Sequence, residues 1–204
     1  MTERALLLAG WGTAPARLDP LAAALEERGI TAEVHGYQPT GTLDRLGTAL
    51  AHRVAELRAD RVHLVGHSLG GLVVAAAALR GVPTLGSVTT VNAPWRGTWA
   101  AYTGDGTLAR ALRWRATELA HLRDGLRDHL ATDDGPRWLL LSALGDLAVP
   151  TTSALRVGAR GPRLTRRRVA VNGHSLSLLA PRLVTAVVDH VTARGRRPLD
   201  DARP

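Results

Sequence analysis

Most of the apolar residues stand in short runs separated by amphipathic segments. Within the runs, apolar residues follow one another without the polar–apolar alternation of a half-exposed strand. Such continuous runs are typical of strands that are buried on both faces of a mainly parallel sheet. They predict six strands, over residues 5–9, 31–35, 61–65, 86–91, 138–142 and 168–171.

The segments between the predicted strands have helical periodicity. In the clearest case, apolar residues recur at steps of three and four from Leu43 to Leu57, and Thr42 stands where an N-cap is expected. Asp19 and Pro20 are the expected N-cap and first-turn proline of an earlier helix. Further helices are predicted over 69–80, 107–130 and 181–192.

Strands that alternate with helices predict an α/β fold, with helices on both faces of about six mainly parallel strands. A chain of 204 residues is long enough for one such domain. We expect the domain to cover residues 1–195 and the polar residues 196–204 to form a flexible tail. In open α/β sheets, ligands bind beyond the carboxyl ends of the strands, so the residues that follow each predicted strand are the candidates for chemistry.

A Gly-x-Ser-x-Gly motif follows the third predicted strand directly. The residues are Gly-His-Ser-Leu-Gly-Gly over positions 66–71, and a helical pattern begins at once after them. A strand, this motif and a helix together indicate a nucleophile elbow, a turn so sharp that the flanking glycines must lack a Cβ. Ser68 is therefore the predicted nucleophile.

A serine hydroxyl needs a base, and the base needs an orienting carboxylate. His174 follows the last predicted strand, and Asp146 follows the strand before it. The chain order Ser68, Asp146, His174 is the one expected for a nucleophile elbow on a parallel sheet. Asp105 is a weaker rival for the acid, and the aspartates at 133 and 134 precede a strand and so belong to the wrong end of the sheet.

Backbone amides are the predicted donors to the developing oxyanion. The amide of Leu69 lies at the start of the helix after the nucleophile, and the amide of Trp11 lies in the loop after the first strand. Gly10 would let that loop approach the nucleophile, and Gly12 is a second choice as donor.

These residues resemble the α/β-hydrolase superfamily, over about residues 4–193, and within it small bacterial lipases and esterases. Besides the motifs above, Asn-Ala-Pro-Trp-Arg-Gly-Thr at 92–98 is similar to a Thr-Pro-His-Arg-Gly-Ser/Thr stretch of those lipases. The resemblance implies a small α/β-hydrolase fold that lacks the first two strands of larger members. It implies a Ser-His-Asp triad that needs no metal or organic cofactor.

The residues that bind substrate are predicted only from their positions relative to the strands and the nucleophile. Trp95, Trp99 and Tyr102 follow the carboxyl end of a strand and are expected to line an acyl pocket. Gly10, Gly12 and His67, beside the nucleophile, complete the predicted substrate-binding set. Residues 100–134 are expected to be the crossover between two parallel strands, with Gly125 bending or breaking the helix; a mobile lid that carries Trp114 is the alternative.

The amino-acid composition excludes several kinds of catalytic group. The chain has no Cys, and all 26 of its basic residues are Arg, so thiolate nucleophiles, Schiff-base lysines and Ser-Lys dyads are excluded. The net charge of +8 includes a dense run of arginines at 160, 163, 166, 167 and 168. No aromatic residues are interleaved with this run, so we expect a solvated loop and no nucleic-acid partner.

The sequence thus predicts a serine hydrolase that cleaves small-molecule or lipid esters of carboxylic acids, with transient contact to a lipid surface. A thioesterase or acyltransferase with the same triad, or a non-catalytic partner-binding protein, are the alternatives. The apolar stretch near the N-terminus is about five residues long, shorter than the ~7–15 of a secretory signal. This favours a cytoplasmic protein over a secreted one.

Overall fold

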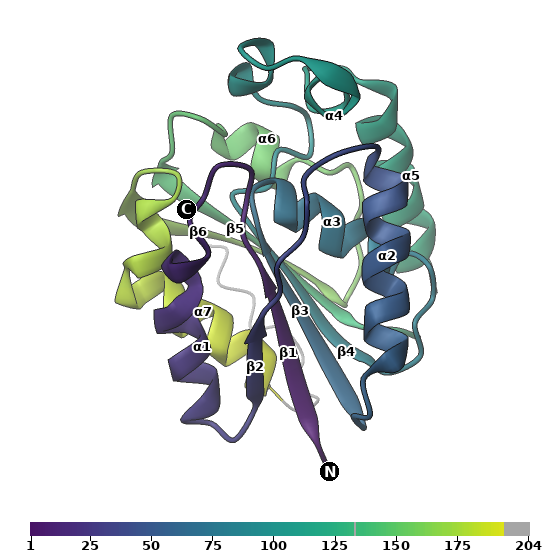
Figure 1. Ribbon diagram of the computed structural model, residues 1–204, viewed down its shortest axis with the longest axis vertical. Helices are drawn as coiled ribbons and strands as arrows, with labels where there is room; N and C mark the ends of the chain where they lie inside the picture. Colours follow the sequence, from purple (N-terminus) through teal and green to yellow (C-terminus); the bar gives the residue numbers. More distant parts are fainter. Residues whose placement is uncertain (133, 194–204) are drawn as a thin grey trace.

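The computed structural model describes residues 1–132 and 134–193, and it contains one six-stranded sheet (Figure 1). The strand order is β2-β1-β3-β4-β5-β6, and every neighbouring pair is parallel. The predicted mainly parallel sheet is therefore confirmed. The strands are β1 (Glu3–Leu8), β2 (Thr31–Val34), β3 (Arg61–His67), β4 (Leu85–Val91), β5 (Arg137–Gly145) and β6 (Leu164–Asn172).

Helices cover both faces of the sheet (Figure 1). The helices α1 (Asp19–Glu26) and α7 (Pro181–Thr192) pack on one face, and α2 (Leu43–Glu56), α3 (Leu69–Ala78) and α5 (Thr117–Leu130) pack on the other. Along β1, Leu6 and Leu8 belong to one hydrophobic cluster while Ala5 and Leu7 belong to the other. This division explains the continuous apolar runs, because successive side chains of a strand point to opposite faces and both faces are buried.

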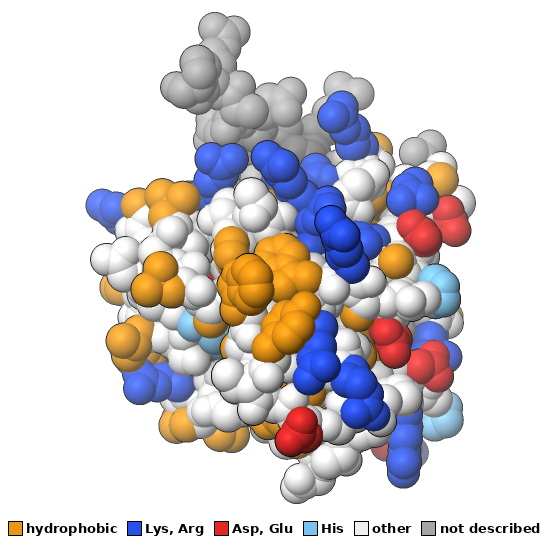
Figure 2. All heavy atoms as spheres, turned by 90° about the horizontal axis from the view of Figure 1, so that it is seen from above, with side chains coloured by type: hydrophobic (Ala, Val, Ile, Leu, Met, Phe, Trp, Pro, Cys, Tyr) orange, Lys and Arg blue, Asp and Glu red, His pale blue; other side chains and the backbone are white. Residues whose placement is uncertain are grey.

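Short elements lie beyond the carboxyl ends of the strands, at the top of Figure 1. They include α4 (Gly106–Ala111), α6 (Thr151–Leu155) and the 3₁₀ helix η2 (Trp99–Tyr102). Seen from above, hydrophobic side chains gather near the centre of this end of the molecule (Figure 2). The other 3₁₀ helices are η1 (Pro15–Leu18) and η3 (Leu176–Leu179). The sequence did not predict α6 and η3, since elements of four or five residues carry no readable periodicity.

The predicted helix over 107–130 is two helices. The break separates α4 from α5, and within it Arg115 has a φ of +64°. Gly125 does not end α5, which continues to Leu130; a Cβ there would lie 3.2 Å from Cδ1 of Leu79, the residue that follows α3, so this glycine lets the Leu79 side chain pack closely on α5. At α1, Asp19 is the first helical residue and its side chain caps nothing, whereas Thr42 accepts a hydrogen bond from the amide of Arg45, as predicted.

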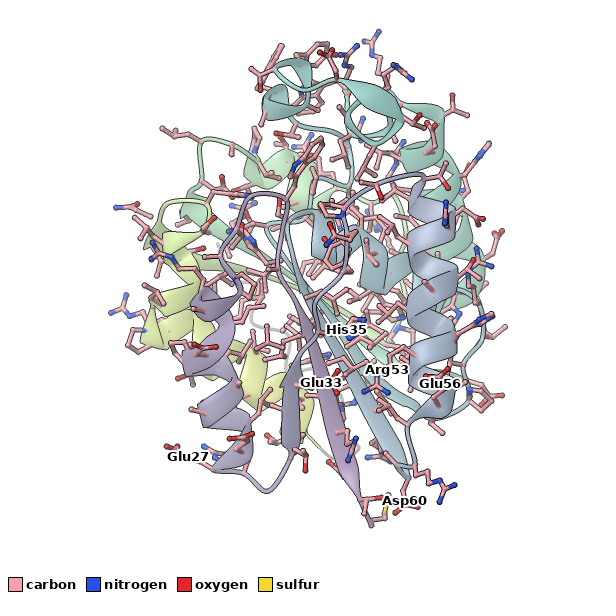
Figure 3. The ribbon with its side chains drawn as sticks, in the orientation of Figure 1. Glu27, Glu33, His35, Arg53, Glu56 and Asp60 are labelled. Carbon is pink, nitrogen blue, oxygen red and sulfur yellow. The ribbon has the colours of Figure 1, made fainter. Side chains whose placement is uncertain are left out.

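Both edge strands carry charged side chains. At the β2 edge, Arg53 of α2 donates to Glu33, and His35 contacts the same carboxylate; Figure 3 shows these side chains converging. At the β6 edge, the strand begins at Leu164 rather than at 168, so Arg166 and Arg167 also lie in the strand and not in the predicted loop. Charged residues are tolerated there because β6 has a neighbour on one side only, and they also discourage pairing with another sheet.

Residues 194–204, which include the predicted tail, lie outside the described residues. Within the described part of the chain, no helix is both long and apolar enough to cross a bilayer.

Two histidines are buried on or beside the central strands. His63 and His67 of β3 have no exposed surface. Burial lowers the pKa of His63 to about 4, against the opposing effect of the nearby Glu3 carboxylate. Burial also lowers the pKa of His67 to about 3, with a smaller contribution from His174. Both side chains are therefore neutral in the folded protein at physiological pH.

Neutral buried histidines predict that acid destabilises the fold. The unfolded chain binds protons near pH 6.5 while the folded chain does not, so stability is greatest above about pH 6.5 and falls as the pH drops from there toward 4. Each histidine contributes a slope of about 1.4 kcal/mol per pH unit in this window. Urea unfolding followed by circular dichroism between pH 7.5 and 4.5 measures this slope. His63→Gln should reduce it, and the exposed control His52→Gln should not; equal slopes in all three proteins would contradict this assignment.

Candidate active site

Ser68 lies on a strained turn between β3 and α3. Its backbone has φ of +53° and ψ of −121°, a region that residues with side chains rarely occupy. The glycines around it are sterically required. A Cβ at Gly66 would collide with the Gly70 carbonyl, and a Cβ at Gly70 would lie 2.5 Å from the Leu8 carbonyl oxygen. The turn therefore has the geometry expected of a nucleophile elbow, and it places Ser68 beyond the carboxyl end of β3.

Asp146 and His174 form a hydrogen-bonded pair at the ends of β5 and β6. His174 Nδ1 lies 2.7 Å from Asp146 Oδ2. The other carboxylate oxygen, Oδ1, accepts from the amides of Ala148 and Val149, each at 2.9 Å, and the Asp146 side chain is completely buried. Because the carboxylate is held on both oxygens, it fixes the imidazole with Nδ1 as the donor and leaves Nε2 as the nitrogen that can accept a proton.

The backbone carbonyl of His174 is also held, by three side chains from different elements. It accepts from His67 Nε2 at 3.1 Å, Asn92 Nδ2 at 3.0 Å and Ser177 Oγ at 2.8 Å. Asn92 follows β4 with a φ of +49°, and its Oδ1 accepts from the amide of Ala143 on β5 at 2.8 Å. Asn92 thus ties the ends of β4 and β5 to the loop that carries the imidazole.

His67 does not meet the prediction that it binds substrate. It has no exposed surface, and its ring centre lies 4.6 Å from that of His174. Being neutral with Nε2 as donor, it presents Nδ1 as an acceptor to Thr13 Oγ1 at 3.4 Å, and Thr13 Oγ1 lies 3.1 Å from Ser175 Oγ. His67 therefore connects the loop after β1 to the loop after β6 and positions His174.

The loop after β1 runs directly beside the nucleophile. A Cβ at Gly10 would lie 2.6 Å from Ser68 Cβ, so only glycine allows this approach. Trp11 and Gly12 form the following turn, closed by a bond from the Thr13 amide to the Gly10 carbonyl at 3.1 Å. Leu69 is the first residue of α3, where free amides and the helix dipole favour negative charge. The roles of the Trp11 and Leu69 amides as oxyanion donors remain predictions, as does the substrate role of Gly12.

The aromatic residues divide into a buried one and two exposed ones. Trp95 has no exposed surface and donates from Nε1 to Thr90 Oγ1 at 3.2 Å, so it belongs to the core and cannot line an open pocket. Trp99 and Tyr102, on η2, are 65% and 50% exposed. The prediction of a lining position is wrong for Trp95 because its side chain packs in the hydrophobic cluster that also contains buried residues of α3 and α5.

The rival carboxylates lie elsewhere. Asp105 is exposed and precedes α4, and Asp134 is exposed and precedes β5 at the opposite end of the sheet; Asp133 lies outside the described residues. The sequence did not reveal the roles of Asn92, Thr13 and Ser177. The one signal in the sequence was the position of Asn92, a polar residue that directly follows a predicted buried strand.

The sequence matches no protein-family model and no curated protein. The structure is similar to solved structures over nearly the whole chain. A hydrolase from Pseudomonas aeruginosa PA01 has 20% sequence identity and a TM-score of 0.65, with 94% of this chain and 91% of that chain covered. A monoacylglycerol lipase from Paleococcus ferrophilus has 15% identity and a TM-score of 0.64, with 93% and 96% covered. An extracellular alpha/beta-hydrolase from a Paenibacillus species has 12% identity and a TM-score of 0.61, with 94% and 100% covered. The chain therefore has the α/β-hydrolase fold, as the resemblance implied.

The bonds to the His174 carbonyl predict that Asn92 controls the reactivity of Ser68. Asn92→Gly removes the side-chain bonds, while glycine adopts a positive φ without strain. Without the bond from Asn92 to the His174 carbonyl, the imidazole should be less well positioned. A fluorophosphonate probe should then label Ser68 more slowly, by up to about 10²-fold. Ser177→Ala, which removes one of the three donors and leaves Asn92 in place, should slow it less. Labelling at the original rate in a folded Asn92→Gly protein would contradict this role.

Proposed function

We propose that this chain hydrolyses carboxylic esters through an acyl-enzyme on Ser68. The observation that carries the proposal is the combination of the strained serine turn after β3 with the Asp146–His174 pair, 2.7 Å apart, at the ends of β5 and β6. All three side chains belong to one edge of one parallel sheet, the edge at which this class of fold binds its ligands. Such a combination is the arrangement that serine acyl transfer requires.

The reaction would proceed in two halves. In the first, His174 Nε2 takes the Ser68 hydroxyl proton as Oγ attacks the acyl carbonyl carbon, and the same proton then passes to the departing alkoxide, which leaves as the alcohol. In the second, His174 deprotonates a water that attacks the acyl carbon, and the proton returns to Ser68 Oγ as the carboxylic acid is released. Asp146 stabilises the imidazolium formed in each half.

The oxyanion of each tetrahedral intermediate would be held by the amides of Leu69 and Trp11. The proximity of Gly10 to Ser68 supports this assignment, because it brings the backbone after β1 against the nucleophile. Fixed amides at this point stabilise charge that develops only in the transition state and are typically worth about 3–4 kcal/mol each.

Apolar side chains in the catalytic loops support an ester with an apolar acyl or alcohol part. Trp11 is 46% exposed, Leu147, which follows Asp146, is 91% exposed, and Leu176 in the loop after His174 is 59% exposed. Each loop of the proposed machinery therefore offers apolar surface to a substrate. The monoacylglycerol lipase among the similar structures is compatible with this substrate class.

Substitution of the triad tests the reaction. Ser68→Ala should abolish turnover of p-nitrophenyl butyrate, and Asp146→Asn should lower kcat/KM by about 10⁴-fold because the imidazole loses its orienting charge. Asp105→Asn is the matched control, since Asp105 is an exposed aspartate outside the pair, and it should retain activity. Undiminished turnover by Ser68→Ala would overturn the proposal.

A series of substrates tests the substrate class. Esters of increasing acyl length and an acyl thioester of equal length, each with and without an alcohol acceptor, should show hydrolysis of the oxygen esters as the fastest reaction, with kcat/KM rising as apolar surface is added. Faster turnover of the thioester, or acyl transfer that exceeds hydrolysis, would replace esterase by thioesterase or acyltransferase. Activity on none of them would favour the non-catalytic alternative.

A further inference from the structure

Aromatic side chains gather over the carboxyl ends of the strands, three of them exposed and one, Trp114, half-buried. We call this the aromatic face: Trp11, Trp99, Tyr102 and Trp114. The Trp99 ring centre lies 6.0 Å from that of Tyr102 and 5.9 Å from that of Trp114. Trp11 joins from the loop after β1, because a Cβ at Gly104 would lie 3.5 Å from its ring. Figure 2 looks down on this end of the molecule and shows hydrophobic side chains gathered there.

The aromatic face is bordered by positive charge. Arg96, Arg110 and Arg115 are exposed on the segment that carries it, and Arg113 lies over the Tyr102 ring at 5.2 Å. Over residues 94–117 the chain has four arginines and a single acidic residue, Asp105. Blue side chains flank one side of the hydrophobic patch in Figure 2. Apolar rings and cations therefore occur together on this surface.

We propose that the aromatic face docks the protein on a lipid bilayer whose surface carries anionic phosphate headgroups. Tryptophan and tyrosine rings prefer the boundary between headgroups and acyl chains, where an apolar ring can be buried beside polar groups. Arginine stems lie along the apolar boundary while their guanidinium groups reach the headgroup phosphates. A bilayer surface therefore offers favourable contacts to the aromatic rings and to the arginines at the same time.

The charges favour a lipid surface over a second copy of the chain. Two copies that met through their aromatic faces would bring the same arginines together, and the net charge of +8 adds to that repulsion. An anionic bilayer, in contrast, attracts each arginine near its surface by about 1 kcal/mol.

Docking in this orientation would turn the catalytic loops toward the lipid. Trp11 stands in the loop that passes Ser68, and the exposed Leu147 and Leu176 follow Asp146 and His174. A lipid ester could then pass from the bilayer to Ser68 without crossing bulk water. This orientation of the reaction rests on the proposed function, whereas the docking itself does not.

Vesicle flotation of the full chain as Ser68→Ala measures docking independently of any activity. The inactive protein should float with vesicles of phosphatidylcholine containing about one quarter phosphatidylglycerol, more strongly at about 0.05 M than at about 0.5 M salt, and bind weakly to phosphatidylcholine alone. Tryptophan emission should shift to shorter wavelength on binding. Adding Trp99→Ala should weaken binding to the anionic vesicles and reduce this shift.

Two arginine pairs provide the matched control. Arg110→Gln with Arg115→Gln should weaken binding to the anionic vesicles on the order of tenfold to thirtyfold at low salt. Arg28→Gln with Arg58→Gln removes the same charge from residues that follow α1 and α2, at the far end of the sheet, and should change binding by no more than about twofold. Circular dichroism checks that every variant is folded.

Three results would overturn the proposal: no flotation with anionic vesicles, equal losses from the two arginine pairs, or sedimentation showing a dimer that Trp99→Ala dissociates. The first would mean that the surface does not bind a lipid bilayer, the second that only net charge matters, and the third that a second copy covers the aromatic face. None of them would bear on whether Ser68 cleaves esters, which the active protein and soluble substrates test.

Discussion

The site depends on one steric constraint, the sharp passage of the chain from β3 into α3 at Ser68. The positive φ of this serine costs of order 1–3 kcal/mol and persists only because the surroundings impose it. The Ser68 amide donates to the Val91 carbonyl at 2.8 Å, and α3 behind it is buried along its whole length. At Gly66, Gly70 and Gly10 the backbone segments approach one another so closely that a Cβ would collide with a neighbouring residue. The tightly packed turn at the start of the buried α3 is thus what presents the hydroxyl.

Around this turn, hydrogen bonds hold Asp146 and His174 in place. Asp146 is held by two amides of its own loop, and the carbonyl of His174 is held by His67, Asn92 and Ser177. These contacts draw on the ends of β3, β4, β5 and β6, so the imidazole is located by the whole carboxyl edge of the sheet. Fixed donors and acceptors of this kind let a site stabilise charge without reorganising during the reaction. The buried His67 fits this scheme because, when neutral, it can donate from one ring nitrogen and accept at the other.

Strong local patterns in the sequence predicted the sheet and the edge of the sheet at which the candidate site lies. Short runs rich in apolar residues predicted the parallel sheet, and the Gly-x-Ser-x-Gly motif, with Asp146 and His174 each after a strand, predicted a site at one edge. The sequence-based prediction failed where the direction of a side chain or its tertiary packing decides the position of a residue. Trp95 and His67 stand beside the site in the chain but turn into the core. Arg166 and Arg167 lie in the first part of β6, which the sequence did not reveal because an edge strand need not be apolar on both faces. The break between α4 and α5 comes at Arg115 rather than at a glycine, a conformation that residue type alone does not predict.

The central claim is that Ser68 becomes acylated with His174 as its base, and the most direct measurement is to trap that intermediate. A rapid acid quench of the protein with excess p-nitrophenyl butyrate, followed by proteolysis and mass spectrometry, locates the acyl group. The proposed mechanism predicts a single butyryl group on Ser68, absent when His174 is replaced by Ala. An acyl group on another side chain, such as Ser175, or turnover with Ser68 never modified, would contradict it.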